Sequence, residues 1–349
     1  MRLLFVTDTH LRGVAPRNRT DDFVATVKAK LQEVVALANE LQVAAVLHGG
    51  DVFDVPMPGL AATGEFAAVL RSLEAPLYVV PGNHDLHGQN PASLMRTLLG
   101  FLGRWGVVRI LDNNPVYLDD GHVRVQVSGA PFHFAIDDGG RDYIVKKQNC
   151  DVAIHICHGA LLDRSFGPMV KYTLIDDIAS LTEADYTLSG HYHLGYADVC
   201  RDGKWFLNPG ALVRLSASSG EISRWPAVVV LYVEGGGVRH KTVKLKSARP
   251  GPEVLDRSGL EETAFRAKKR QEFLQAVRQI TSEAGFLSRT DPQAILTRVL
   301  EGMKEKPEYT LVQAEVLALW AEVAEECKDE GWTAKTPRTQ GKESSGSGL

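Results

Sequence analysis

The first 110 residues alternate short apolar runs with longer stretches in which apolar residues recur at helical spacing. Three of the apolar runs predict buried strands, at residues 2–6, 43–50 and 76–80. The longer stretches predict helices, at residues 20–42, 64–75 and 92–106. Thr20 or Asp21 is expected to cap the first of these helices. Strands and helices that alternate through short links favour a mainly parallel sheet covered by helices.

The rest of the chain divides into a strand-rich part and a helical part. Residues from about 107 to 245 contain further strand patterns, so we expect an α/β fold in which two sheets form a sandwich flanked by helices. A Pro/Gly-rich boundary at 248–253 follows. We therefore expect a main domain over 1–250, a helical region over 256–330 that carries three amphipathic patterns, and a disordered polar tail over 334–349.

Composition limits the function classes. The formal net charge of −4 gives no support for bulk attraction to polyanions, so nucleic-acid binding would need a local basic patch or metal ions. No apolar run is long enough for a membrane span, and the start of the chain is too short for a secretory signal. The four cysteines lack metal-ligand spacing and are interpreted as free thiols of a cytoplasmic protein.

Five of the expected strands each end in side chains that can bind a metal ion. In chain order these side chains are Asp8 and His10, Asp51 and Asp54, Asn83 and His84, His158, and finally His191 and His193. In open α/β sheets, ligands bind outside the carboxyl ends of the strands. His155 is a rival to His158 in the same strand, and the alternation of the strand together with its end position favours His158.

These residue types suit a pair of divalent ions. Carboxylates and imidazoles bind Mn²⁺, Fe²⁺, Zn²⁺ or Mg²⁺, and a shared carboxylate can bridge two ions. Two ions about 3.5–4 Å apart can hold a bridging hydroxide and clamp the attacking and leaving oxygens of a phosphate ester. A nearby histidine, with an ordinary pKa of about 6.5, could donate a proton to the leaving alkoxide.

These five motifs, in this order, resemble those of the calcineurin-like metallophosphoesterase superfamily over roughly residues 1–210. The family pattern is Asp-x-His, Gly-Asp, Gly-Asn-His-Asp or Glu, a lone His and Gly-His-x-His. For one ion, the resemblance implies the ligands Asp8, His10, Asp51 and His193. For the other ion, it implies Asp51, as a bridge, with Asn83, His158 and His191.

The same resemblance implies a role for His84. This histidine would donate the proton to the leaving group and contact the phosphate, oriented by a neighbouring carboxylate. Asp54 and Asp85 are expected to support histidines of the site from behind the metal ligands. We expect Mn²⁺ as the metal, with Mg²⁺, Fe²⁺ or Zn²⁺ as alternatives, because the shell mixes oxygen and imidazole ligands.

Longer segments are similar to those of the SbcCD-type DNA repair nucleases. They are "DTHLRG", "GGDVFDVPMPG", "VVPGNHDLHG" and "NPGALVRL", followed by a basic run with Lys241, Lys244, Lys246 and Arg249. The resemblance implies a DNA exonuclease or endonuclease that is the nuclease subunit of a repair complex with an SbcC-like coiled-coil ATPase, docked through residues 256–330. The chain departs from that family in these residues, which show a helical pattern where a mixed α/β capping domain is expected.

Other functions are open at this point. The same metal site would serve a phosphodiesterase or phosphatase that acts on small nucleotides or phosphoproteins. A third hypothesis is a binding module that uses the fold as a scaffold, and the presence of all seven candidate ligands together with His84 argues against it. A homodimer is compatible with the sequence.

Overall fold

The computed structural model of the chain describes residues 1–167, 170–235, 237–259, 265–266 and 268–271. Met1–Leu260 forms one compact unit. Most of the helical region expected over 256–330, and the whole tail expected over 334–349, lie outside the described residues. Among the helices that are described, none is long and apolar enough to cross a membrane.

The described residues contain two six-stranded mixed sheets, which confirms the predicted α/β sandwich. The first sheet has the order β14-β13-β1-β2-β3-β4, and β1 to β4 run parallel to one another. Its strands are β1 (Arg2–Val6), β2 (Ala45–His48), β3 (Leu77–Val79), β4 (Arg109–Ile110), β13 (Ala227–Glu234) and β14 (Gly237–Lys244). Antiparallel pairing of β13 with β1 and of β14 with β13 completes the sheet.

The second sheet has the order β11-β12-β10-β7-β6-β5. Its strands are β5 (Val116–Asp119), β6 (Arg124–Ala130), β7 (Val152–His158), β10 (Tyr186–Gly190), β11 (Tyr196–Arg201) and β12 (Lys204–Asn208). The four inner strands are parallel, whereas β5 and β11 pair antiparallel at the two edges. A separate parallel pair is formed by β8 (Leu161–Leu162) and β9 (Thr173–Leu174).

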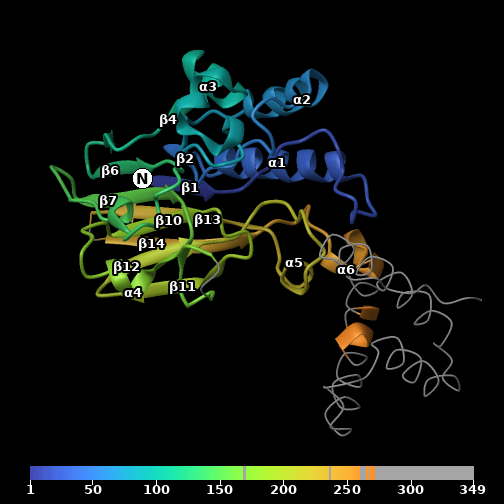
Figure 1. Cartoon of the computed structure of the whole chain (residues 1–349). Coiled ribbons are helices and arrows are strands. Elements are labelled where there is room, and N and C mark those ends of the chain that lie inside the picture. Colours follow the sequence, from blue (N-terminus) through green and yellow to red (C-terminus); the bar gives the residue numbers. More distant parts are fainter. Residues whose placement is uncertain (168–169, 236, 260–264, 267, 272–349) are drawn as a thin grey trace, which may run out of the picture. The chain divides into compact units, whose positions relative to one another are not determined.

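Strand β1 is buried on both faces because it lies between two hydrophobic layers. Leu4 and Val6 belong to the core between the first sheet and its helices. Leu3 and Phe5 belong to the core between the two sheets. Figure 1 shows the helices on one side of the first sheet and the second sheet on the other. This arrangement explains the continuous apolar sequence of β1, which is typical of a strand covered on both faces.

Three helices cover the outer face of the first sheet: α1 (Phe23–Glu40), α2 (Leu60–Leu70) and α3 (Leu98–Arg104). The predicted cap of α1 was wrong, because Asp22 accepts the hydrogen bond from the Ala25 amide. Asp21 instead accepts hydrogen bonds from the side chains of Arg19 and Thr26. These side-chain partners occupy the carboxylate that would otherwise have served as the cap.

Two other helix boundaries differ from the prediction. Helix α2 begins at Leu60 rather than at residue 64, and Leu60 is 89% exposed, so no apolar periodicity marks this first turn. The helix predicted over 92–106 is divided into a 3₁₀ helix, η2 (Pro91–Arg96), and α3. Thr97 separates them because its extended backbone caps α3, with its hydroxyl accepting from the Gly100 amide.

The remaining helical elements are too short to show a hydrophobic periodicity in the sequence. They are the 3₁₀ helices η1 (His87–Gln89) and η3 (Arg141–Tyr143) and the helices α4 (Ile175–Ile178), α5 (Ser219–Ser223) and α6 (Gly251–Val254). Val254 and Leu255 are buried against Ala217. The main unit therefore includes α6, which follows the boundary expected at residue 250.

Helix α1 carries a lysine, Lys30, that is buried in the interior, where lysine side chains are rare. Lys30 is 1% exposed, and its ammonium donates a hydrogen bond to the Leu212 carbonyl at 3.1 Å. Burial, reinforced by the guanidinium groups of Arg19 and Arg214, lowers the pKa of Lys30 to about 7. The protonated form is therefore destabilised in the folded chain.

This lowered pKa predicts a pH dependence of stability. Between about pH 7 and the ordinary lysine value of 10.5 the unfolded chain holds the proton that folded Lys30 has lost, so the free energy of unfolding should rise with pH. Below pH 7 both states are protonated and the destabilisation is complete. Lys30→Met should remove this part of the rise. Urea unfolding of metal-free protein at about pH 6.5 and about pH 9 tests it, and parallel profiles for the two proteins would contradict it.

Candidate metal centre

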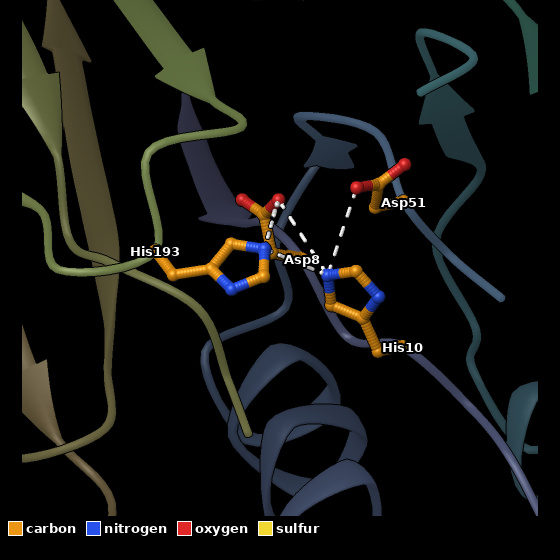
Figure 2. A group of neighbouring side chains, drawn as sticks. All are labelled: Asp8, His10, Asp51 and His193. Atoms are coloured by element: carbon orange, nitrogen blue, oxygen red, sulfur yellow. Dashed lines mark hydrogen bonds and ion pairs between the residues drawn. The ribbon is translucent and has the colours of Figure 1, made fainter. Parts of the chain in front are cut away.

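The strands that end in candidate ligands all open onto one region. Strands β1, β2 and β3 of the first sheet and β10 of the second are each followed within a few residues by candidate ligands, and β7 of the second sheet ends at one, His158. Strands β1, β2 and β3 run parallel to one another, and so do β7 and β10. The carboxyl ends within each sheet therefore lie at the same edge of that sheet, where ligands bind in α/β folds. Four side chains from the loops after three of these strands converge there (Figure 2): Asp8, His10, Asp51 and His193.

This first group has the spacing of a metal-ligand shell, with one potential ligand atom from each residue within 4.8 Å of the others. The Nε2 atoms of His10 and His193 are 2.9 Å apart and point toward each other. His10 Nε2 lies 3.6 Å from Asp51 Oδ2, and His193 Nε2 lies 3.6 Å from Asp8 Oδ1. Two imidazole nitrogens and two carboxylates thus face a common point.

A second group adjoins the first and shares Asp51 with it: Asp51, His158 and His191. His158 Nε2 lies 3.3 Å from Asp51 Oδ2 and 3.1 Å from Asn83 Oδ1. His191 Nδ1 lies 2.9 Å from the same amide oxygen. Asn83 therefore presents its oxygen to the second group, while Asp51 faces both groups.

The two donor sets fit two divalent ions. Each combines imidazole nitrogens with carboxylate or amide oxygens, a mixture that suits Mn²⁺, Fe²⁺ or Zn²⁺ and does not by itself decide between them. The carboxylates are buried, with Asp8 0% and Asp51 1% exposed, and buried carboxylates require a counter-charge. The structure thus contains a candidate dinuclear metal centre.

The backbone is strained at four residues of the centre. Asp8, His10, Asp51 and His191 have positive φ angles of 49°, 40°, 53° and 73°, a conformation that costs free energy for residues other than glycine. Such strain persists only where the surrounding structure enforces it. It turns the chain sharply after β1, β2 and β10 and so directs these side chains into the centre.

Hydrogen bonds fix the orientation of the candidate ligands. Thr7 donates its hydroxyl hydrogen to Asp8 at 2.6 Å, and the His84 amide donates to Asp51 Oδ1 at 2.8 Å. His158 Nδ1 lies 2.7 Å from the Gly49 carbonyl oxygen. A proton on Nδ1 satisfies that carbonyl and leaves Nε2 of His158 available as a ligand.

Charges in the metal-free centre are strongly perturbed. Burial disfavours the charged form of His158, but the carboxylates of Asp51 and Asp8 outweigh burial and raise its pKa to about 9. Burial together with the neighbouring charge of His10 lowers the pKa of His193 to about 3. Burial together with the charge of His158 lowers the pKa of His191 to about 4. The imidazolium of His158 thus balances part of the carboxylate charge, a task that metal ions would take over.

His84 lies beside the first group with its side chain 40% exposed. Its ring is oriented by the backbone carbonyl of Asp54, 2.9 Å from Nδ1, whereas the Asp54 carboxylate is 4.0 Å away. This corrects the expectation that a carboxylate orients His84. The Asp54 carboxylate instead lies 3.4 Å from His10 Nδ1 and forms an ion pair with Arg12 at 2.8 Å.

Asp85 supports the centre differently from the prediction. Within the described part of the chain, its carboxylate accepts hydrogen bonds from the backbone amides of Val52, Phe53 and Gly82 rather than contacting a histidine. Burial and the charge of Asp51 raise the pKa of Asp85 to about 6. Asp85 therefore joins the loop after β3 to the loop that carries Asp51.

His155 and His48 stand outside both groups. His155 Nδ1 lies 2.9 Å from the Ser128 hydroxyl, and its Nε2 lies 2.9 Å from the Asp142 carbonyl. His48 Nε2 lies 3.1 Å from the Thr9 hydroxyl. The structure therefore brings His158, and not His155, to the centre.

Two glycines that the sequence analysis did not single out keep the centre open. A Cβ atom at Gly50 would lie 2.2 Å from His158 Nδ1, and one at Gly82 would lie 2.2 Å from Asp51 Oδ1. Gly50 also has a φ of +96°, which other residues rarely adopt. The Gly-Asp and Pro-Gly-Asn-His motifs were the signal that could have identified them.

Gly82→Ala is expected to displace the Asp51 side chain. The added methyl group would also meet the Asp51 backbone nitrogen at 2.3 Å, so it cannot be accommodated by a rotation of the side chain alone. We expect weaker binding of both metal ions, measured by titration of the metal-free protein with Mn²⁺. Gly59→Ala is a useful control, because a Cβ atom there meets nothing within 4 Å and that position, like Gly82, has no positive φ. Equal metal affinity in the two variants would contradict the prediction.

Two stacked sheets with a candidate dinuclear histidine–aspartate cluster at their strand ends are the features that the sequence motifs predicted for a metallophosphoesterase. The family model described as calcineurin-like phosphoesterase matches residues 1–195, and the chain belongs to this family. It is 25% identical over 259 residues to the DNA double-strand break repair protein Mre11 of Methanosarcina mazei, and 24% identical over 258 residues to that of Methanosarcina acetivorans. Each alignment covers 71% of this chain but 39% of the relative's length. The solved structure of a dimetal phosphatase from Danio rerio matches at a TM-score of 0.45 and 11% identity, covering 70% of this chain and 98% of that one.

Proposed function

We propose that this chain is a metal-dependent nuclease that hydrolyses phosphodiester bonds of DNA, as an exonuclease or an endonuclease. The observation that carries the proposal is the alignment with two Mre11 proteins, which covers 71% of the chain at 24–25% identity. Both relatives are named for the repair of DNA double-strand breaks. The sequence segments shared with SbcCD-type nucleases support the same substrate. Because the chain spans 39% of the length of those relatives, their whole activity is not assumed for it.

We assign the two clusters as two metal sites that share Asp51. One ion would be held by Asp8, His10, Asp51 and His193. The other would be held by Asp51, Asn83, His158 and His191. Two divalent ions, which we propose to be Mn²⁺, would lower the pKa of a water molecule and neutralise the charge of a phosphodiester.

His84 is assigned as the proton donor to the leaving oxygen. Its exposed ring stands beside the first group, with the ring centroid 4.8 Å from that of His10. The Asp54 carbonyl accepts a hydrogen bond from Nδ1–H, so the proton for the leaving oxygen would come from Nε2–H of the imidazolium, which becomes a neutral imidazole. A histidine held in this way can protonate an alkoxide near neutral pH.

A substrate panel tests the proposal. It comprises labelled single- and double-stranded DNA, a cyclic nucleotide, a phosphopeptide and bis(p-nitrophenyl) phosphate, each with Mn²⁺ and with a chelator. We expect cleavage of DNA and of the small phosphodiester in Mn²⁺ and none with the chelator. Hydrolysis of the cyclic nucleotide or the phosphopeptide with DNA left intact would instead support a small-nucleotide phosphodiesterase or a phosphatase. Full activity without bound metal would contradict the assignment of the site.

We further propose that residues 256–330 dock an SbcC-like coiled-coil ATPase. Their amphipathic patterns predict short helices whose apolar stripes need a partner, and helix-in-groove docking would supply one. A chain that ends at residue 260 keeps α6 and the whole main unit. It should still hydrolyse the small phosphodiester but no longer co-purify with the ATPase. Unchanged binding by the shortened chain would refute the docking role.

Two other expectations remain part of this proposal. The protein would act on DNA in the cytoplasm, in agreement with the unpaired cysteines among the described residues, Cys150, Cys157 and Cys200. The basic run adds little support for a DNA-binding surface, because Lys241 and Lys244 lie exposed on the edge strand β14 and Arg249 pairs with Glu253 at 3.1 Å. A homodimer is the second of these expectations, and analytical ultracentrifugation tests it.

A further inference from the structure

The segment Ala211–Val213, here called the strap, lies between β12 and β13 and belongs to neither strand. It is part of the "NPGALVRL" motif, to which the proposed chemistry gives no role. All three of its residues are 0% exposed. A buried segment without a strand partner must satisfy its backbone amides and carbonyls elsewhere, and the partners it uses show what it does.

The amides of the strap reach two loops of the metal centre. The Ala211 amide donates to the carbonyl of His193 at 2.9 Å. The Leu212 amide lies 3.2 Å from the carbonyl oxygens of both Thr7 and Asp8. Asp8 and His193 come from different sheets, so the strap joins the two sheets at the candidate ligands of one ion.

The carbonyls of the strap are held by cationic side chains. The guanidinium group of Arg224 donates to the carbonyls of Ala211 and Val213. The ammonium group of Lys30 donates to the carbonyl of Leu212 between them, at 3.1 Å. Every backbone carbonyl of the strap therefore accepts a hydrogen bond from a basic side chain.

This arrangement places several cations close together in the interior. Lys30 and Arg214 are both 1% exposed, and Arg19 and Arg224 contribute further positive charge near Lys30. The carboxylates that face this cluster are Glu221, in an ion pair with Arg224 at 2.7 Å, and Asp21. Burying charge is costly, and a group that served packing alone could be apolar.

We propose that Lys30 and Arg224 are positioning residues for the metal centre, acting through the strap to fix the separation of Asp8 and His193. The inference rests on the metal sites assigned under the proposed function, but not on the identity of the substrate. The strap bonds to the chain at two ligands of the first ion and at none of Asn83, His158 and His191. Loss of the hydrogen bonds from Lys30 or Arg224 to the strap should therefore weaken binding of the first ion selectively.

The test is the titration of the metal-free full-length protein with Mn²⁺ by calorimetry. The wild-type chain should bind two ions. Lys30→Met should weaken one binding step by about 10- to 100-fold, the range found when a group that orients a metal ligand is lost, and leave the other unchanged. Arg224→Lys, which keeps one cationic donor, should weaken the same step less than Arg224→Met. Lys28→Met is the matched control, since Lys28 lies on the same helix and pairs at the surface with Glu65.

Electron paramagnetic resonance of the Mn²⁺-loaded proteins supplies a second readout. The signal of a coupled ion pair should weaken in Lys30→Met and persist in Lys28→Met. Equal weakening of both binding steps, in parallel with lower stability to urea, would assign Lys30 a merely structural role and overturn the proposal, as would wild-type affinity in Lys30→Met. If that variant does not fold, the two Arg224 variants decide by the same criteria. Normal metal binding by a wild-type chain that does not cleave DNA would refute the proposed nuclease function but not the role of the strap.

Discussion

Asp51→Ala should remove metal from both sites and nearly abolish hydrolysis of every phosphodiester. The carboxylate lies 3.6 Å from His10 Nε2 in one group and 3.3 Å from His158 Nε2 in the other, so its loss takes a ligand from both ions at once. Because bound metal contributes several kcal/mol to charge stabilisation, the rate should fall by about 10³-fold or more. Metal content and turnover, measured on the same preparation, test this.

The control for this variant is Asp177→Ala, an exposed aspartate on α4 outside both groups. It should keep two ions per chain and full turnover. Retention of both ions by Asp51→Ala would contradict the assignment of Asp51 as the shared ligand. Loss of a single ion would restrict Asp51 to one site.

His84→Ala should have the opposite signature, with both metals kept and turnover on DNA lowered by about 10²–10⁴-fold, the usual contribution of a general acid. The ring does not belong to either group that contains Asp51, and the Asp54 carbonyl orients it beside them. p-Nitrophenolate leaves without needing a proton, so hydrolysis of bis(p-nitrophenyl) phosphate should fall much less than cleavage of DNA.

This contrast between leaving groups separates proton donation from phosphate binding. An equal loss on both substrates would show that His84 acts by contacting the phosphate. Loss of metal from His84→Ala would make it a ligand and reverse the assignment. His122→Ala, at an exposed turn before β6, should behave as wild type on both substrates.

The buried parallel strands and the residues at their ends could be predicted from the sequence for a physical reason. Parallel strands buried on both faces are continuously apolar, so polar residues such as Asp8 after β1 and Asn83 after β3 mark the points where the apolar strands end. The same logic favoured His158, at the end of β7, over His155 within it. The structure brings these residues into the two groups.

Other features depend on contacts that no local pattern reveals. The positive φ of Asp51 and the need for glycine at position 82 follow from how closely two loops approach. Asp22 replaces Asp21 as a helix cap because Arg19 and Thr26 already bind Asp21. The edge strands β5 and β11 are half-exposed and lack the apolar runs that marked the inner strands.

The assigned roles all depend on a dinuclear metal centre that is bridged by Asp51. Its most direct test is anomalous diffraction at the manganese edge from crystals of the full chain grown with Mn²⁺. We expect two peaks about 3.5–4 Å apart, one beside His10 and His193, the other beside His158 and His191, with the Asp51 carboxylate between them. A single peak, or two peaks that Asp51 does not touch, would contradict it.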